Sequence, residues 1–438
     1  MTAPLYIVHC IDTEGPLYES LDATFDRVES LFGVRLDPTR ENLARLRRKE
    51  IDLGGKEDAA ATVVSEHLLD YNDTWDKVDD MLYEMLGGDY RQRYADSRGN
   101  GWVYSWFLLD HVGYDTNPRR RDIGYHNVFD HYRTILRETG SEQDDIQFHF
   151  HPMTTYKEAH VCATSYIRSP HLWETLSRRI IDRGWFPSCF RPGFHVERPD
   201  SHWFLEQWIP FDFANQGMDS DEGLHNDIAE GRLGDWRRAP RDWSHYHPHH
   251  DDYQIAGNCN RTIFRCLNIG TRYRLLSDAE VRKAFERAAS GAPTILAFTN
   301  HDFRDMRPDV DGVHQMLLRA SQDYPDVKWL HARARDAARA VLGLNTATAF
   351  ELQVELETSA EHPTLHIRAN QDTFGPQPFL AIRTRDGRYL SDNLDFQEPR
   401  RYWTYTLGPE TVLPDGVDKI AVASNALSGQ TAVATCAI

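Results

Sequence analysis

Four polar clusters in this sequence each follow directly after a segment that is predicted to be a β-strand. They are Asp12-Thr13-Glu14, His149-Phe150-His151, Arg191 and Asn300-His301-Asp302. In α/β proteins the active site gathers at the carboxyl ends of parallel strands. We therefore expect these clusters, which are far apart in the chain, to meet at one polar site.

The pair His149 and His151 predicts a metal site. On an extended backbone, residues i and i+2 point to the same face, so the two imidazoles lie side by side. Two imidazoles and a carboxylate hold a divalent ion and leave a position for water, which is the catalytic type of site. A hydrogen-bonded core role is the alternative for an isolated His-x-His. The acids at another strand end favour a divalent metal, with zinc as the first expectation.

Asp12 and Glu14 are candidates for two different roles. They share a face if the first strand continues through them, and one would then be a metal ligand and the other a base. The alternative is a turn or a helix cap, because Asp-Thr-Glu-Gly is favourable turn chemistry. The residue types leave open which acid takes which role.

In chain order, the segments DTEG, HFHP, FRPG and NHD resemble the motif series of the NodB-homology polysaccharide deacetylases, carbohydrate esterase family 4 in the broad sense. The resemblance covers about residues 4 to 340 and implies a distorted (β/α)7 barrel. It also implies site roles: a catalytic base at Asp12, an arginine that orients this base at Arg191, a catalytic acid at His301, and metal ligands at Glu14, His149 and His151.

The sequence departs from the pattern of that family at several points. The usual Asp-Asp pair is Asp-Thr-Glu here, and the usual H-x-x-x-H is shortened to H-x-H. The late motif, which normally follows Leu-His, is Asn-His-Asp. Asp12 therefore stays a second candidate for the metal ligand. About 135 residues separate the first two motifs, which predicts an insertion between them.

Four further residues are candidates for contact with a substrate. His195 follows the FRPG motif, and Trp106 lies near the end of another predicted strand, where core packing is an equal alternative. His247 and Tyr253 belong to a stretch that is rich in histidine and aromatic residues, and such a stretch suits a sugar-binding cleft. An exposed polar loop is the alternative, because a His-rich tract is only compositional evidence.

The elements that must position these residues follow an alternating pattern up to about residue 344. Strands are predicted at residues 4–11, 101–110, 145–150, 186–190, 211–214, 263–268, 293–299 and 327–330, with helices between them. Such alternation indicates a parallel α/β fold, here a barrel over residues 1–344. Beyond that point the period becomes two, with turn signals between the segments, which predicts a β-sandwich domain over residues 345–438.

Composition narrows the class of protein. The chain has 438 residues and a formal net charge of −18, which argues against binding to nucleic acid or to an anionic membrane surface. No apolar run approaches the ~18 residues of a membrane span. The six cysteines form no CxxC pair and the start of the chain reads as a strand, so we expect reduced cysteines and a cytoplasmic protein.

The resemblance implies a metal-dependent hydrolase that removes an N-acetyl group from a sugar, in surface-polysaccharide (O-antigen, capsule or lipopolysaccharide) biosynthesis. The expected partner is a carbohydrate: an N-acetylated sugar, a nucleotide sugar or a lipid-linked glycan. A homo-oligomer is compatible with the sequence. Two alternatives stay open, because a fold alone does not give a function. One is a deformylase or other amide hydrolase on the same barrel, and the other is a catalytically silent glycan-binding or scaffold protein.

Overall fold

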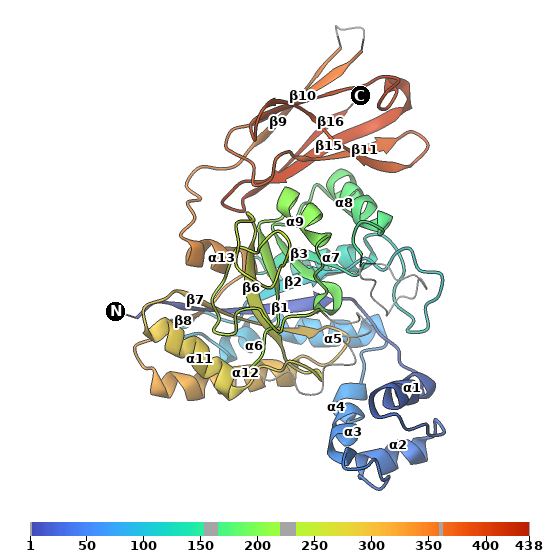
Figure 1. The fold of residues 1–438 in the computed structure, drawn as a ribbon, viewed down its shortest axis with the longest axis vertical. Helices are drawn as coiled ribbons and strands as arrows, with labels where there is room; N and C mark the ends of the chain where they lie inside the picture. The colour runs from blue at the N-terminus through green and yellow to red at the C-terminus, as the bar shows by residue number, and fades with distance from the viewer. Residues whose placement is uncertain (1, 153–164, 220–233, 359–361, 438) are drawn as a thin grey trace.

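Short apolar runs between helical segments form a parallel sheet in the computed structural model, which describes residues 2–152, 165–219, 234–358 and 362–437 (Figure 1). The strands of this sheet are β1 (Leu5–Thr13), β2 (Tyr104–Leu108), β3 (Asp145–Phe150), β4 (Cys189–Pro192), β5 (Phe211–Asn215), β6 (Thr262–Asn268), β7 (Thr294–His301) and β8 (Trp329–His331).

The sheet closes into a barrel because β1 pairs on both sides. Asp12 lies opposite His301 of β7 and opposite Phe107 of β2. Each remaining pair from β2 to β7 is parallel and follows the sequence order. Strand β8 pairs with residues 5–7 at the start of β1, before β2 joins, and so stands beside the ring of seven. The predicted (β/α)7 barrel is confirmed.

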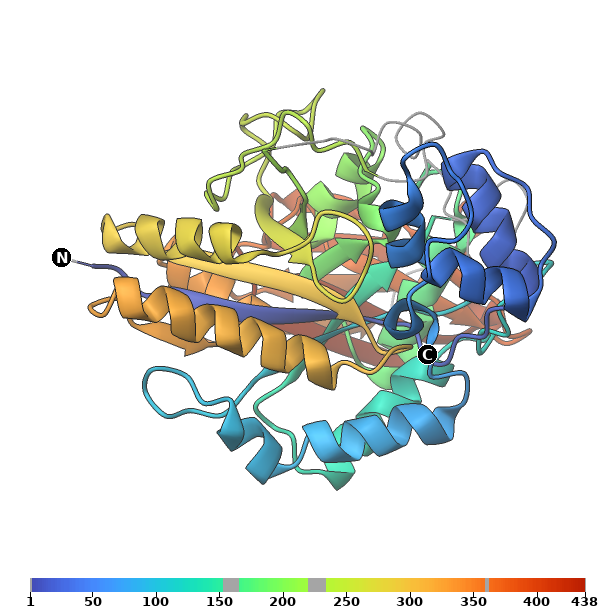
Figure 2. The same ribbon diagram turned by 90° about the horizontal axis from the view of Figure 1, so that it is seen from below.

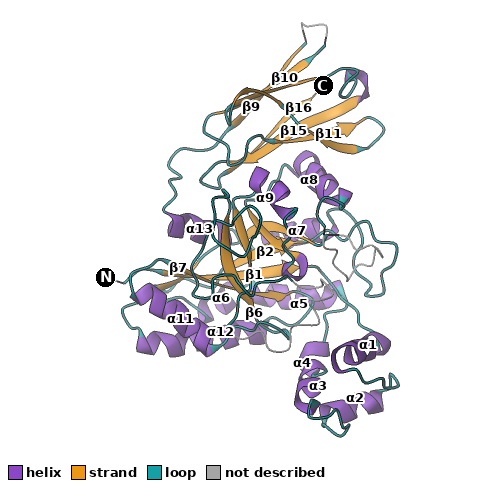
Figure 3. Ribbon diagram, viewed as in Figure 1, coloured by secondary structure: helices purple, strands orange, loops and turns teal. Residues whose placement is uncertain are grey.

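Helices surround this ring (Figure 3). They are α7 (Asn127–Glu138), α8 (Pro170–Arg183), α9 (Ser201–Trp208), α11 (Asp278–Ala289), α12 (Arg307–Asp323) and α13 (Ala334–Leu342). The hydroxyl of Ser277 accepts a hydrogen bond from the Glu280 amide and caps α11, as its position before the helix predicts. Helix α12 begins at Arg307, because Pro308 fits the first turn of a helix, where no N–H is needed.

The insertion predicted between the first two motifs is helical. It contains α1 (Leu21–Phe32), α2 (Arg40–Arg47), α3 (Glu57–Val63), α4 (Glu66–Leu69), α5 (Trp75–Met85) and α6 (Gly88–Arg93). Helices α1 to α4 pack around a small core of their own, which includes Phe25, Val28, Leu46 and Val64. This lobe lies beyond the carboxyl end of β1 (Figure 2). Helices α5 and α6 instead pack against the barrel.

The C-terminal strands form two four-stranded antiparallel sheets, which confirms the predicted β-sandwich. The strands are β9 (Leu352–Glu357), β10 (Thr364–Ala369), β11 (Phe379–Thr384), β12 (Tyr389–Asp392), β13 (Asp395–Glu398), β14 (Tyr402–Thr406), β15 (Val417–Asn425) and β16 (Thr431–Ala437). Their inward residues, among them Leu365, Ile382 and Trp403, form one buried cluster between the sheets.

The sandwich rests on α8 and α9 of the barrel. The indole N–H of Trp208 donates to the carbonyl of Gln377 at 3.1 Å. The Asn425 amide donates to the carbonyls of Pro187 and Trp208 at 2.7 and 2.8 Å. Around these bonds, apolar residues of α8, α9, β11 and β15 form one buried cluster. The two parts of the chain therefore share apolar surface.

Two expectations from the sequence concern membrane spans and the oxidation state of the cysteines. No helix among the described residues combines the length and the apolarity that crossing a membrane requires. The five cysteines within the described ranges are all free, and Cys10, Cys189 and Cys266 are buried. The sixth, Cys162, lies outside the described residues.

Candidate metal centre

Alternation along β1 points the two acids of the first motif into the barrel. Val8 and Cys10 belong to the cluster that fills the barrel interior, while Ile7 and Ile11 pack outward against the helices. The strand continues through Asp12 and Thr13, two residues beyond its predicted end, because both pair with β2. Asp12 therefore points inward, and Glu14, two residues later, points the same way.

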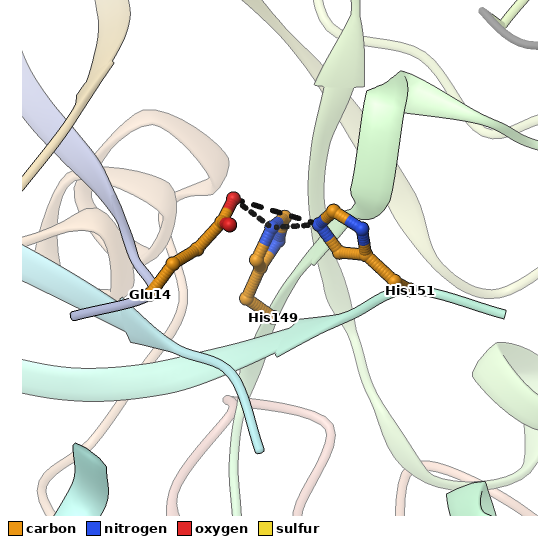
Figure 4. Close-up of side chains that lie close together, drawn as sticks. All are labelled: Glu14, His149 and His151. Carbon is orange, nitrogen blue, oxygen red and sulfur yellow. Dashed lines mark hydrogen bonds and ion pairs between the residues drawn. The ribbon is translucent and has the colours of Figure 1, made fainter. Parts of the chain in front are cut away.

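Glu14, His149 and His151 meet at the carboxyl ends of β1 and β3 (Figure 4). The Nε2 atoms of the two histidines lie 3.0 Å apart. The Oε1 atom of Glu14 lies 3.8 Å from Nε2 of His149 and 3.6 Å from Nε2 of His151. All three residues are buried. Three potential ligand atoms thus form a triangle inside the barrel mouth.

This triangle fits a divalent metal ion. Ligand atoms at 2.0–2.2 Å from a tetrahedral zinc ion are about 3.3 Å apart, close to the three separations observed. The ring N–H at Nδ1 of His149 donates to the carbonyl of Arg191 at 2.8 Å, which leaves the lone pair of Nε2 for the metal. The Nε2 atoms of the two histidines face each other at 3.0 Å, and a cation between them would satisfy both lone pairs. The Glu14–His149–His151 triad can therefore bind a metal ion.

The segment after β4 shapes the wall beside His151. A Cβ atom at Gly193 would lie 2.3 Å from the His151 ring, so glycine is required for the histidine to take this position. Phe194 and His195 both have φ near +50°, in the left-handed region that non-glycine residues seldom adopt. The ring of Phe194 meets His151 edge to face at 5.2 Å. Strained backbone of this kind is common where a segment serves a site.

Asp12 is held by Arg191. The guanidinium donates from Nε to Oδ1 at 2.6 Å and from Nη2 to Oδ2 at 3.0 Å, and both groups are buried. Burial alone would raise the pKa of Asp12, but the charges of Arg191 and His149 hold it far below its usual range. Asp12 is therefore a carboxylate at neutral pH. Because Arg191 occupies both of its oxygens, Glu14 is the better placed metal ligand.

Glu14 itself has a partner that the strand-end signal did not indicate. Arg121, in the segment between β2 and α7, forms a buried ion pair with Oε2 of Glu14. Although burial would raise the pKa of Glu14, Arg121 and the two histidines hold it well below its usual range. The carboxylate thus stays ionised, with Oε1 turned to the histidines and Oε2 turned to a cation.

Asp302 fixes the chain that carries Glu14. Its carboxyl oxygens accept hydrogen bonds from the backbone amides of Glu14 and Gly15 at 2.9 and 2.8 Å, and from the hydroxyl of Tyr132 at 2.7 Å. Burial raises the pKa of Asp302 to about 7. Asp302 neither caps the following helix nor contacts a histidine in these bonds; it clamps the first motif against β7.

His301 stands on the open side of the centre. Its Nε2 atom lies 3.8 Å from Oδ2 of Asp12 and 3.9 Å from Oε1 of Glu14. Burial lowers the pKa of His301 to about 4, so the imidazole is neutral at neutral pH. A neutral ring beside two carboxylates can accept a proton from one group and pass it to another.

A cavity of about 210 Å³ opens over these residues. Asp12, Glu14, His149, His151 and His301 line it, together with the predicted substrate residue His195. Nε2 of His195 accepts a hydrogen bond from the Gln216 amide at 2.8 Å. The sequence clusters therefore do meet, and Arg191 is bonded to Asp12 of the cavity lining.

The other three predicted substrate residues lie outside the lining of this cavity. Trp106 takes the core position that was its alternative: Phe107 points into the barrel, so Trp106 points outward and donates to Asp144 at 3.2 Å. His247 donates to the carbonyl of Arg261 at 3.0 Å. Tyr253 donates to the carbonyl of Asp235 and packs against Trp236.

Sequence reasoning did not identify Arg121 or Asp302 as site residues with these contacts. Arg121 lies in a segment without a regular pattern, and its charge alone does not distinguish it from the other arginines in the chain. Asp302 follows His301 on the opposite face of the strand, so its role depends on a contact with a distant backbone segment. No model of a known protein family matches this chain, and no curated protein matches it.

Proposed function

We propose that this protein is a metal-dependent hydrolase that removes an N-acetyl group from a sugar. The observation that carries the proposal is the buried Glu14–His149–His151 triad, placed beside the Asp12–Arg191 pair and His301 in one cavity. A metal site with a free coordination position, a general base and a group that carries protons are the catalytic groups that a metal-dependent hydrolase needs. The motif resemblance to the NodB-homology polysaccharide deacetylases supports an N-acetylated sugar as the substrate. It also supports a role in surface-polysaccharide biosynthesis.

The proposed roles follow from charge and position. When bound by Glu14, His149 and His151, a divalent metal polarises an acyl carbonyl and lowers the pKa of water. Asp12 accepts the proton of the attacking water, and Arg191 keeps this carboxylate ionised and aimed. His301, within 3.8 Å of Asp12, takes up this proton and delivers it to the nitrogen of the departing amine.

Metal content is the first test. Protein purified without added chelator should contain about one equivalent of divalent metal by elemental analysis, with zinc expected. His151→Ala should lose the metal, because it removes one of three ligands. His250→Ala is the matched control, since this histidine is exposed and outside the cavity. If the native protein contains no metal, the proposed enzymatic function is wrong, and a catalytically silent scaffold protein is favoured.

Product analysis separates the acetyl group from other acyl groups. We expect acetate release from N-acetylated sugars and from their nucleotide-linked forms, at a rate that falls at least about a hundredfold in His151→Ala. Formate release from N-formyl sugars without acetate release would replace the deacetylase by a deformylase on the same barrel. No acyl release from either series by metal-loaded protein would contradict the hydrolase.

A further inference from the structure

The cavity wall above the metal triad is unusually rich in arginine for a chain with a net charge of −18. The arginines that line it are Arg27, Arg119, Arg121, Arg272 and Arg304. They come from α1, from the segment between β2 and α7, from the segment after β6 and from the segment after β7. Four separate parts of the fold thus bring cations to one space.

Glu19 neutralises part of this charge. Arg27 donates to both of its oxygens at 2.6 Å, Arg119 forms a further buried ion pair with it, and the hydroxyl of Tyr71 donates to it at 3.0 Å. One carboxylate therefore serves two guanidinium groups. Arg121 has Glu14 as its partner, so two carboxylates compensate three of the five arginines in part.

Arg272 and Arg304 bind neutral oxygens instead. Arg272 donates to the carbonyl of Val63 at 3.1 Å, and Arg304 donates to the carbonyl of Leu68 at 3.3 Å and to the hydroxyl of Tyr71 at 3.4 Å. Within the described residues, neither has a carboxylate at ion-pair distance. Burial and the charge of Arg27 lower the pKa of Arg272, as expected for a cation that faces another cation.

The five guanidinium groups that line the cavity thus form ion pairs with only two carboxylates, which is an excess of three positive charges among these groups in a partly buried space. Asp12 does not change this balance, because Arg191 pairs with it. Like charges at such distances repel, and an anionic ligand relieves the repulsion. A single carboxylate carries one negative charge, whereas a diphosphate carries two or three and offers several oxygens to the planar forks of arginine.

We propose that this arginine wall binds the diphosphate of an activated sugar and so presents the acyl group of that sugar to the metal centre. The presentation to the metal rests on the proposed function, but the diphosphate site does not. Nucleotide-linked and lipid-linked sugars share the diphosphate. The apolar residues Leu17, Leu31 and Phe303 also line the cavity, and they could contact either the nucleoside or the lipid that the diphosphate carries.

Calorimetric titration tests the site without relying on catalysis. The His151→Ala protein is used, so that chelation of the metal by the probe does not contribute heat. Pyrophosphate, a nucleoside diphosphate, a short prenyl diphosphate and citrate are titrated separately. We expect the diphosphates to bind and citrate to bind at least tenfold more weakly. Tighter binding of the nucleoside or of the prenyl compound than of pyrophosphate identifies the source, and either result supports the site.

Variants assign the binding to the arginines. Arg272→Gln and Arg304→Gln should each weaken diphosphate binding at least tenfold, and Glu19→Gln should strengthen it, because it removes a competing anion. Arg388→Gln, at an exposed arginine of the sandwich, should have no effect. Arg272→Lys keeps the charge but not the planar fork, so it should bind diphosphate more tightly than Arg272→Gln and less tightly than native protein, which separates loss of charge from loss of fold.

Two results would overturn the diphosphate site: no diphosphate binding at millimolar concentration, or unchanged affinity in folded Arg272→Gln and Arg304→Gln proteins. The proposed function fails independently of it. Diphosphate binding without acyl release from any loaded sugar contradicts the hydrolase alone, whereas acetate release from diphosphate-linked sugars that is indifferent to both arginine variants contradicts the presentation of the sugar by the arginine wall.

Discussion

At the scale of single residues, the centre depends on one missing side chain. The His151 ring lies where a Cβ atom of residue 193 would be, at 2.3 Å. Gly193→Ala should therefore displace His151 while leaving the barrel folded, because the change lies at the mouth of the sheet and not in its core. We expect metal affinity to fall by about 10- to 100-fold, the usual effect of disturbing a ligand's support.

Gly312→Ala is the matched control for this substitution. Gly312 lies within α12, and a Cβ atom there would meet nothing within 4 Å. Alanine also suits a helix interior better than glycine, by about 1 kcal/mol, so the control should bind metal normally and unfold at a slightly higher temperature. Equal metal affinities in the two variants, measured by competition with a chelator, would show that the His151 position does not depend on Gly193.

The open choice between the two acids of the first motif can be settled by isosteric substitution. Asp12→Asn should keep the metal and lower the rate about 100- to 10,000-fold, because a general base contributes on this scale. Glu14→Gln should instead release the metal, since Oε1 faces both histidines. Metal content and rate are measured on the same preparations. Metal loss in Asp12→Asn with metal retained in Glu14→Gln would reverse the two roles.

Individual site residues were predictable where strand geometry decides their direction. His149 and His151 follow from the i, i+2 rule, and Glu14 follows from it once β1 is known to continue. The contacts of Arg121 and Asp302 were not predictable, because they depend on where an irregular segment and a distant backbone come to lie. Residue type and spacing carry no signal for such contacts.

At the scale of elements, the segment between β1 and α1 is tied down by charge. Glu19 lies in that segment and binds Arg27 of α1, Arg119 and Tyr71. Burial alone would raise its pKa, but the bonds and charges of Arg27 and the charge of Arg119 lower it to about 2, against about 4.5 for the unfolded chain. The stability from this cluster is therefore complete above about pH 4.5 and is lost as the pH falls toward 2.

Thermal unfolding as a function of pH measures this contribution. The native protein should lose up to about 3 kcal/mol between pH 4.5 and 2 through Glu19 alone. Glu19→Gln should show a shallower decline over this window. Glu66→Gln is the control, because Glu66 is exposed and its pair with Arg47 contributes little. Parallel curves for native protein and Glu19→Gln would contradict the low pKa of Glu19 in the folded state.

Elements were predictable to the extent that apolar periodicity marks them. The bounds of β3 agree with the strand predicted at residues 145–150, because both ends of this segment are set by a change in the pattern. The predicted ends of β1 and β7 are too early in the sequence, because backbone pairing continues through the polar residues that follow. Strand β13 leaves no apolar trace in the sequence, because all four of its residues are exposed.

At the scale of the whole molecule, the barrel and the sandwich share one apolar contact. Trp208 lies at its centre: the ring packs edge to face against Phe379 of β11 at 5.0 Å and against Trp173 of α8 at 5.4 Å. Its indole N–H also donates to the carbonyl of Gln377. Shared burial of this kind couples the folding of the two parts, so we expect native protein to unfold in a single transition.

Substitution within α9 tests this coupling, because the helix carries two tryptophans with opposite environments. Trp208 is 7% exposed and Trp203 is 63% exposed. Trp208→Ala should cost about 3–5 kcal/mol and split the denaturant curve in two, since the cavity lies between the barrel and the sandwich. Trp203→Ala should cost less than about 0.5 kcal/mol and keep one transition. Circular dichroism follows both variants without relying on tryptophan emission. Equal midpoints for the two variants would mean that the barrel is stable without its contact to the sandwich.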